Sequence, residues 1–263
     1  MPGFARLAAV AALMLLTSLA PGQAQNSSLK GYGVVLLHGK LFGPGAFVGD
    51  LIAALRAEGA RVETPEMPWS KSRMYDASYE QAMREIDAAV ARLKAQGAKK
   101  IVIAGHSMGA NAAIGYAARR QGLAAVMALS PGHLPETEEL REYTREAVAR
   151  AKQLVAAGRG NEKMSFPDRA QGWPYAVEAT PRIYLSLFDP HGPAVMPRNA
   201  AAMPALPFLW LVGKSDPIYP RGPGYAYARG AKHPKSRYLV IDAGHIGAPS
   251  AARVEMVAWL KSL

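Results

Sequence analysis

Three side chains of the types that cooperate in nucleophilic catalysis occur along the chain in the order serine, aspartate, histidine. Ser107 is the middle residue of GHSMG, which follows the apolar run KKIVIA and precedes the small, helix-forming residues ANAAIG. A serine at such a strand-to-helix turn exposes its hydroxyl, and the N-terminus of the following helix offers unpaired N–H groups to a developing oxyanion. Ser107 is therefore the predicted nucleophile.

A serine hydroxyl is a poor nucleophile until a base removes its proton, and a histidine base needs a carboxylate to fix its tautomer. His245 ends the run YLVIDAGH and is the predicted base, whereas Asp216 follows FLWLVGKS and is predicted to hold His245. Asp189, in FDPHGP, competes with Asp216 for this role. Asp242 is a weak candidate because it lies only three residues from His245 on the same segment.

The remaining histidines have no predicted chemical role. His38 is expected to support a nearby loop by hydrogen bonding, and His106 is expected to pack within the turn at the serine. His133, His191 and His233 are dispersed and lack the spaced Asp, Glu or Cys partners of a metal site. No GxGxxG sequence opens a helix, which argues against a dinucleotide site. The sequence thus predicts neither a metal nor another cofactor.

Short apolar runs alternate with helical patterns after residue 30, and they are expected to place these side chains. Predicted strands lie at 32–39, 60–68, 99–105, 123–132, 208–213 and 236–245. Helical patterns occur at 46–59, 78–97, 111–122, 136–154 and 250–263, and a further strand is possible at 182–188. This order predicts an α/β fold with a mostly parallel, roughly six-stranded sheet and helices on both faces.

Composition limits the function classes. The chain has 263 residues, which suits one catalytic domain, and it has no cysteine, which excludes disulfides and a thiolate nucleophile. The formal net charge is +11, but lysine and arginine are scattered rather than massed in one run, so no nucleic-acid partner is expected.

Residues 1–24 have the pattern of a secretory signal peptide. Arg6 precedes the apolar run LAAVAALMLLTSLA, and PGQAQ supplies small residues for cleavage after Ala24, or alternatively after Gly22. The other interpretation is an uncleaved anchor, although the run is short for a bilayer span. We expect an exported protein, periplasmic or secreted, with no stable membrane span after cleavage.

The sequences GHSMG, LLHGK, LVGKSDPIYP and DAGH resemble those of the α/β-hydrolase fold family, in particular its serine esterases and lipases. The resemblance covers residues 32 to about 130 and about 205 to 263. In that family the loop after the first of these strands supplies one oxyanion N–H group. The resemblance assigns this role to Lys40, with Leu41 as the alternative, beside the backbone N–H of Met108 after the serine.

The chain departs from the family pattern in two places. Scarcely ten residues separate the expected cleavage site from the first strand, so the family's two leading antiparallel strands are expected to be missing. Residues 133–206 occupy the position of a cap or lid within a hydrolase domain at 25–263.

The prediction is an exported serine hydrolase that cleaves a small-molecule carboxylic ester through an acyl-enzyme. A peptidase, thioesterase or acyltransferase could use the same residues. A non-catalytic binding protein on this fold is a third hypothesis, against which the presence of all three side chains argues.

Overall fold

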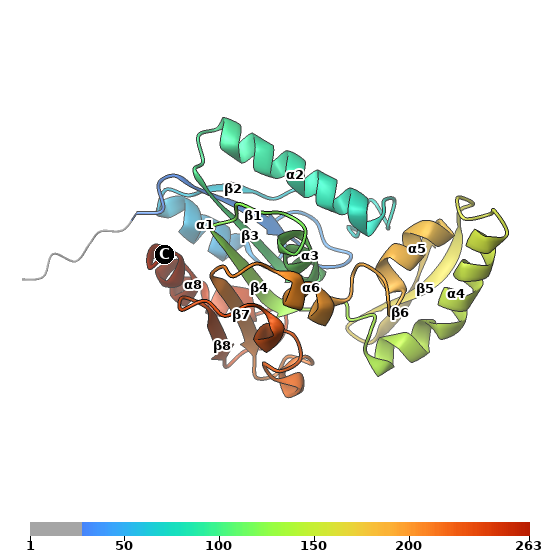
Figure 1. The fold of residues 1–263 in the computed structure, drawn as a ribbon. Helices are drawn as coiled ribbons and strands as arrows, with labels where there is room; N and C mark the ends of the chain where they lie inside the picture. The colour runs from blue at the N-terminus through green and yellow to red at the C-terminus, as the bar shows by residue number, and fades with distance from the viewer. Residues whose placement is uncertain (1–27) are drawn as a thin grey trace, which may run out of the picture.

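A six-stranded sheet forms the centre of the computed structural model, which describes residues 28–263 (Figure 1). The spatial order of its strands is β2-β1-β3-β4-β7-β8, and all neighbouring pairs are parallel. This confirms the predicted α/β fold with a mostly parallel sheet. The strands are β1 Tyr32–Leu37, β2 Arg61–Glu63, β3 Lys100–Ser107, β4 Ala125–Pro131, β7 Phe208–Gly213 and β8 Arg237–Ile241.

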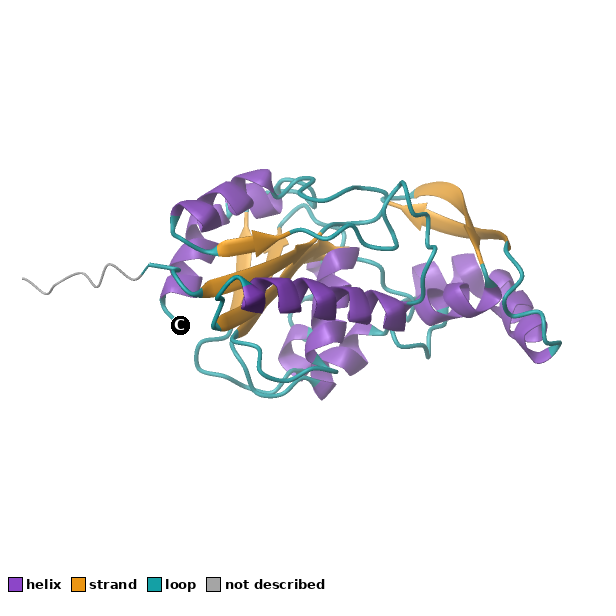
Figure 2. Ribbon diagram, turned by 90° about the horizontal axis from the view of Figure 1, so that it is seen from above, coloured by secondary structure: helices purple, strands orange, loops and turns teal. Residues whose placement is uncertain are grey.

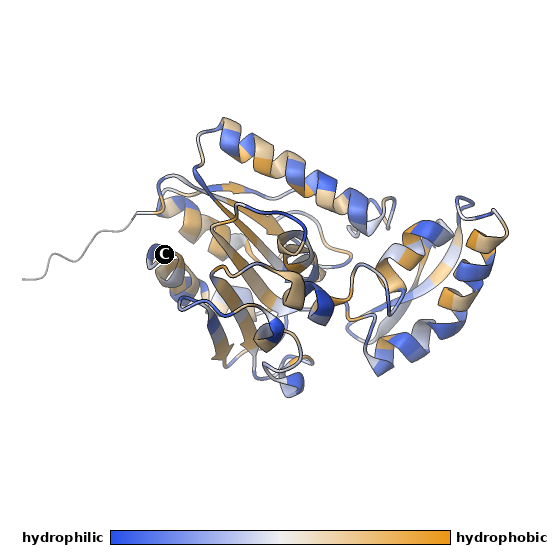
Figure 3. Cartoon of the chain, viewed as in Figure 1, coloured by the Kyte–Doolittle hydropathy of each residue, from blue (hydrophilic) through white to orange (hydrophobic). Residues whose placement is uncertain are grey.

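Helices cover both faces of this sheet (Figure 2). One face packs against α2 (Tyr79–Ala95) and α3 (Met108–Ala117), and the other packs against α1 (Gly49–Ala57), α7 (Ala248–Ala251) and α8 (Arg253–Lys261). Strand β1 contributes to both cores, because Val35 and Leu37 belong to the first and Val34 and Leu36 to the second. Burial on both faces explains why the central strands are continuous apolar runs, which Figure 3 shows in orange.

The predicted N-terminus of α2 is confirmed. Ser78 has an extended backbone and its hydroxyl accepts a hydrogen bond from the backbone N–H of Gln81, which satisfies one of the free donors of the first turn. The helix then buries one apolar face, as an amphipathic helix on a sheet does, and acidic Glu80 lies in its first turn.

The segment between β4 and β7, residues 133–206 and called the insertion below, has its own secondary structure. Its elements are α4 Glu138–Ala156, β5 Met164–Ala170, β6 Trp173–Ala179, α5 Pro181–Phe188 and α6 Met196–Ala202. In Figure 1 the first four lie together beyond the edge of the central sheet. Helices α4 and α5 pack on each other, and α4 also contacts β5.

The prediction of a strand at Arg182–Phe188 is wrong, because these residues belong to α5. Thr180 caps this helix by accepting from the N–H of Ile183, and Pro181 occupies the first turn, where its missing N–H costs nothing. Tyr184, Leu187 and Phe188 then repeat at helical spacing on the buried side. The apolar residues of this short segment thus belong to a helix and not to the strand considered possible.

The antiparallel hairpin β5–β6 was not predicted. Pro167 and Pro174 lie within its strands, which a two-stranded sheet tolerates at non-hydrogen-bonded edges. Gln171 and Gly172 form a two-residue turn, and both have positive φ, as in a type I′ hairpin turn. This turn was the sequence signal that could have revealed the hairpin.

Within residues 28–263, β1 is the first strand. The predicted signal peptide, residues 1–24, lies outside the described residues. None of the described helices combines the length and the apolar character that crossing a membrane requires.

Candidate active site

The backbone at Ser107 has the strained geometry expected of a nucleophile turn. Ser107 is the last residue of β3 and the N-cap of α3, with φ 56° and ψ −119°, a conformation that L-residues rarely adopt. A Cβ atom on Gly105 would stand 2.1 Å from the carbonyl oxygen of Gly109, and one on Gly109 would stand 2.3 Å from that of Leu37. Both glycines of GHSMG are therefore required by the close approach of strand and helix.

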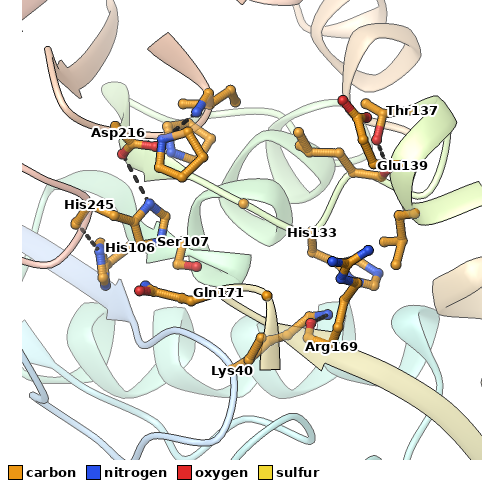
Figure 4. Close-up of a pocket in the computed structure, with 18 of the residues that line it drawn as sticks. Lys40, His106, Ser107, His133, Thr137, Glu139, Arg169, Gln171, Asp216 and His245 are labelled. Carbon is orange, nitrogen blue, oxygen red and sulfur yellow. Dashed lines mark hydrogen bonds and ion pairs between the residues drawn. The ribbon is translucent and has the colours of Figure 1, made fainter. Parts of the chain in front are cut away.

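The strand order explains the location of this turn. The chain leaves β1 toward α1 on one face of the sheet and leaves β3 toward α3 on the other. Because β1 and β3 are neighbours, a crevice opens at their carboxyl ends, which is where open α/β sheets bind ligands. A cavity of about 410 Å³ lies there, and Ser107, Asp216 and His245 all line it (Figure 4).

Asp216 and His245 contact each other directly. His245 Nδ1 lies 2.9 Å from Asp216 Oδ2, while Asp216 Oδ1 accepts a hydrogen bond of 3.0 Å from the backbone N–H of Ile218. Burial alone would raise the pKa of Asp216, but the hydrogen bond and charge of His245 together with the Ile218 amide hold it below its usual value. The carboxylate can thus accept the Nδ1 proton of the imidazole, a contact that orients the ring and directs Nε2 away from Asp216.

Both Ser107 and His245 reach the same cavity, although no hydrogen bond joins the Ser107 hydroxyl to the imidazole among the described residues. Catalytic hydrogen bonds of this kind commonly shorten when substrate binds. The structure therefore brings the three predicted side chains together from the ends of β3, β7 and β8 without closing the serine-to-histidine contact.

The competing carboxylates lie elsewhere. Asp189 caps the C-terminus of α5, pairs with Lys152 at 2.9 Å and accepts a 3.0 Å hydrogen bond from the backbone N–H of His191. Asp242 is exposed to solvent after β8. Of the three candidates, Asp216 is the one that contacts His245.

His38 holds the loop that follows β1. Its Nε2 accepts from the backbone N–H of Met67 at 2.9 Å, so its proton is on Nδ1, which donates to the carbonyl of Gly39 at 2.8 Å. Trp69 Nε1 donates to the carbonyl of His38 at 2.8 Å. Burial lowers the pKa of His38, which favours this neutral form. The expectation that His38 supports the loop by hydrogen bonding is confirmed.

The backbone N–H groups of Lys40 and Met108 are both free of protein acceptors within residues 28–263. Met108 is the first residue of α3, where helix geometry leaves its N–H without a partner. The N–H of Leu41 donates to the carbonyl of Trp69 at 2.9 Å. The backbone N–H of Lys40 is therefore available to an oxyanion, whereas the N–H of Leu41, the alternative, is already used.

The side chain of Lys40 makes a buried ion pair that sequence reasoning missed. Its ammonium nitrogen lies 2.7 Å from Asp168 Oδ1 on β5. Tyr75 donates its hydroxyl to Asp168 Oδ2 at 2.8 Å, and Tyr175 also donates to that oxygen. Burial would raise the pKa of Asp168, but the Lys40 charge and these hydrogen bonds hold it below its usual value. Asp168 thus links the loop after β1 to the insertion.

Two further histidines are buried beside the cavity. His106 Nε2 lies 2.9 Å from the carbonyl oxygen of His245, and burial together with His245 lowers its pKa to about 4. His133 Nε2 lies 2.8 Å from the carbonyl oxygen of Leu187, and burial, with a smaller effect of Lys40, lowers its pKa to about 3. Both are neutral near pH 7. His106 packs within the turn, as expected, and also supports the backbone of His245.

Metal binding finds no support in the part of the chain that the structure describes. No three His, Cys, Asp or Glu side chains converge there in a way that could hold an ion. The charged groups that do converge are paired with each other, as in Asp216 with His245 and Asp168 with Lys40.

Solved structures share this fold. A structure from work on LipS and LipT, two metagenome-derived lipolytic enzymes, is 16% identical, with 89% of this chain and 95% of that chain covered and a TM-score of 0.64. Monoacylglycerol lipase of Paleococcus ferrophilus is 24% identical, with 88% and 94% covered and a TM-score of 0.61. The thioesterase domain from the curacin biosynthetic pathway is 16% identical, with 88% and 89% covered and a TM-score of 0.50.

At these identities the three similarities show the fold alone. A comparison with curated protein sequences finds no match. The sequence profile described as the alpha/beta hydrolase family matches residues 34–259, which include Ser107, Asp216 and His245. The chain therefore belongs to the alpha/beta hydrolase family.

Proposed function

We propose that this protein is a serine hydrolase that cleaves carboxylic esters through an acyl-enzyme. The observation that carries the proposal is the 2.9 Å contact between His245 Nδ1 and Asp216 Oδ2 in the same cavity as Ser107. A binding protein on this fold would need neither a strained serine turn nor a histidine oriented by a buried carboxylate.

In the proposed reaction, His245 Nε2 takes the proton as Ser107 Oγ attacks the ester carbonyl. The ionised Asp216 stabilises the resulting imidazolium, and the N–H groups of Met108 and Lys40 donate to the tetrahedral oxyanion. His245 then gives its proton to the departing alcohol, which leaves Ser107 acylated. A water molecule, activated by His245 in the same way, releases the acid and restores the serine.

The insertion is proposed to act as a cap. The end of β5 and the turn after it, residues 169–172, line the cavity together with Ser107. Figure 4 places Gln171 close to the serine. Residues of the insertion would thus contact substrate on the side opposite the sheet.

Labelling with a fluorophosphonate probe tests the nucleophile. The native enzyme is expected to label and to hydrolyse 4-nitrophenyl esters, and Ser107→Ala is expected to do neither. Labelling that persists in Ser107→Ala would refute the assignment. A native enzyme that labels but hydrolyses no ester would replace the ester prediction with a peptidase, thioesterase or acyltransferase.

The assignment of the acid is tested by a matched pair of variants. Asp216→Asn is expected to lose about 10⁴-fold in kcat, because the amide favours the wrong tautomer of His245. Asp189→Asn removes a carboxylate that pairs with Lys152 and does not line the cavity, so kcat should stay at the native value. Equal losses in the two variants would contradict the role of Asp216.

We also propose that the protein is exported and that residues 1–24 are removed. When the full chain is produced in a bacterium with a general secretion pathway, the exported protein should begin at Gln25. N-terminal sequencing of the exported and cell-associated fractions makes this measurement. An uncleaved N-terminus throughout would contradict it.

A further inference from the structure

The insertion brings a positive charge to the candidate active site. Arg169, near the end of β5, lines the same cavity as Ser107, and Figure 4 shows it on the side of that cavity away from the serine, near His133. Its guanidinium lies over the ring of Tyr143, 5.0 Å from the ring centroid. Arginine at such a position can bind a carboxylate through two parallel hydrogen bonds.

The other charged side chains that line the cavity are compensated. Lys40 pairs with Asp168 at 2.7 Å, and Arg221 pairs with Glu139 at 2.7 Å. Asp216 is occupied by His245. Within residues 28–263, Arg169 forms no ion pair, so it leaves the cavity with an uncompensated positive charge.

Arg169 is also held in place. Its backbone N–H donates to Asp168 Oδ1 at 2.7 Å, and its carbonyl oxygen accepts from Lys40 Nζ at 3.3 Å. Tyr143, on which the guanidinium lies, donates its hydroxyl to the carbonyl of Asp168 at 3.4 Å. The backbone of Arg169 and the Tyr143 ring that contacts its guanidinium are therefore both fixed before any ligand binds. This lowers the entropic cost of binding.

The neighbouring carboxylate does not cancel this charge. Asp168 is buried, and its negative charge is already opposed by Lys40 and by the hydroxyl groups of Tyr75 and Tyr175. The formal charge of +11 adds a general attraction for anions, which raises their rate of encounter.

We infer that the preferred substrates are esters that carry a carboxylate away from the reacting carbonyl, and that this carboxylate binds Arg169. The inference rests on the proposed ester hydrolysis at Ser107. The expected substrate is an anionic ester, such as the monoester of a dicarboxylic acid, and not a purely apolar ester.

Paired substrates test the inference. On the acyl side, mono-4-nitrophenyl glutarate is compared with methyl 4-nitrophenyl glutarate, in which the carboxylate is masked. On the alcohol side, 4-acetoxybenzoate is compared with its methyl ester. We expect kcat/KM to favour the anionic member of at least one pair by about tenfold, and added salt should reduce this ratio.

The matched variants are Arg169→Gln and Arg150→Gln. Arg150 is an exposed residue of α4 that does not line the cavity, and its substitution removes the same net charge. Arg169→Gln should lower the ratio of anionic to masked kcat/KM about tenfold, and Arg150→Gln should leave the ratio unchanged. Arg169→Lys should retain part of the preference, since it keeps the charge but loses the two-hydrogen-bond geometry.

Three results would overturn the inference: no preference for either anionic ester in the native enzyme, an unchanged ratio in Arg169→Gln, or an equal loss in Arg150→Gln. Calorimetric binding of mono-4-nitrophenyl glutarate to Ser107→Ala separates this inference from the proposed function. Weaker binding to Ser107→Ala/Arg169→Gln than to Ser107→Ala supports the carboxylate site even if the nucleophile is another residue, and equal binding refutes it.

Discussion

Replacing Asp168 by asparagine should destabilise the protein strongly. Among the described residues, the Asp168 carboxylate is the only group that forms an ion pair with the buried ammonium group of Lys40. The side chain of Asp168 is 0% exposed and that of Lys40 is 9% exposed. Asparagine keeps the size and an oxygen acceptor but removes the charge. The Lys40 ammonium is then left buried without compensation.

Breaking a buried ion pair by removing one partner costs about 3–5 kcal/mol of folding free energy. For a chain of this size each kcal/mol lowers Tm by roughly 2–4 °C, so Asp168→Asn should lower Tm by roughly 6–20 °C. Because Asp168 has a lowered pKa, its ion pair stabilises the fold fully above the unfolded value of about 3.9 and is lost as pH falls through the folded value. The difference in Tm between the native protein and Asp168→Asn should therefore have its full size at pH 7 and should become smaller as the pH falls toward 3.

Thermal and urea unfolding followed by circular dichroism measure this difference. Glu162→Gln is the control, because it breaks a pair with Arg159 in which the side chains are 52% and 56% exposed, and it should leave Tm unchanged. Lys40→Met combined with Asp168→Asn should cost less than the sum of the two single substitutions, since each single change isolates the other group. A shift in Asp168→Asn no larger than that of the control, or additive effects in the double variant, would refute the reasoning.

Two further predictions concern the turn and the buried histidines. Gly109→Ala should lower Tm and abolish esterase activity, because its Cβ would stand 2.3 Å from the carbonyl oxygen of Leu37. The control is Gly224→Ala, where a Cβ meets nothing within 4 Å, and it should change neither Tm nor activity. Full activity in Gly109→Ala would contradict this prediction. His106 and His133 should stay neutral from pH 8 to pH 5, since their pKa values are lowered to about 4 and about 3. Because the unfolded chain binds protons on these rings from its ordinary pKa of about 6.5, stability should fall as pH falls below that value. Nitrogen NMR shifts of the two rings make the measurement, and a midpoint near 6.5 for either ring would count against it.

The alternation of buried strands and helices was readable from the sequence because each element carries a local period. Continuous apolar runs predicted the central strands, and the spacing of apolar residues in α2 predicted its buried face. In a parallel sheet the carboxyl ends of strands lie at one edge, so residues that follow strands in the sequence are brought together there. That is why Ser107, Asp216 and His245 could be proposed as a group.

Local patterns failed where the segment was short or where its partner was distant in sequence. The apolar residues at 182–188 fit a strand as well as a helix, and the capping by Thr180 together with packing against α4 decided for the helix. The hairpin β5–β6 was hidden by its prolines. Its burial against α4 and α5 is a property of the folded insertion, not of its composition.

By itself the sequence determined the sheet, the turn at Ser107 and the candidates for its partners, since these depend on interactions between near neighbours and on the shared geometry of parallel strands. Only the tertiary structure decided that Asp216 rather than Asp189 contacts His245, and that Asp168 meets Lys40 across 128 residues of chain. It also decided that Arg169 reaches the cavity without an ion-pair partner in the described part of the chain. Each of these outcomes depends on which side chains approach through space, and electrostatic energy depends on that distance and on burial rather than on separation in sequence.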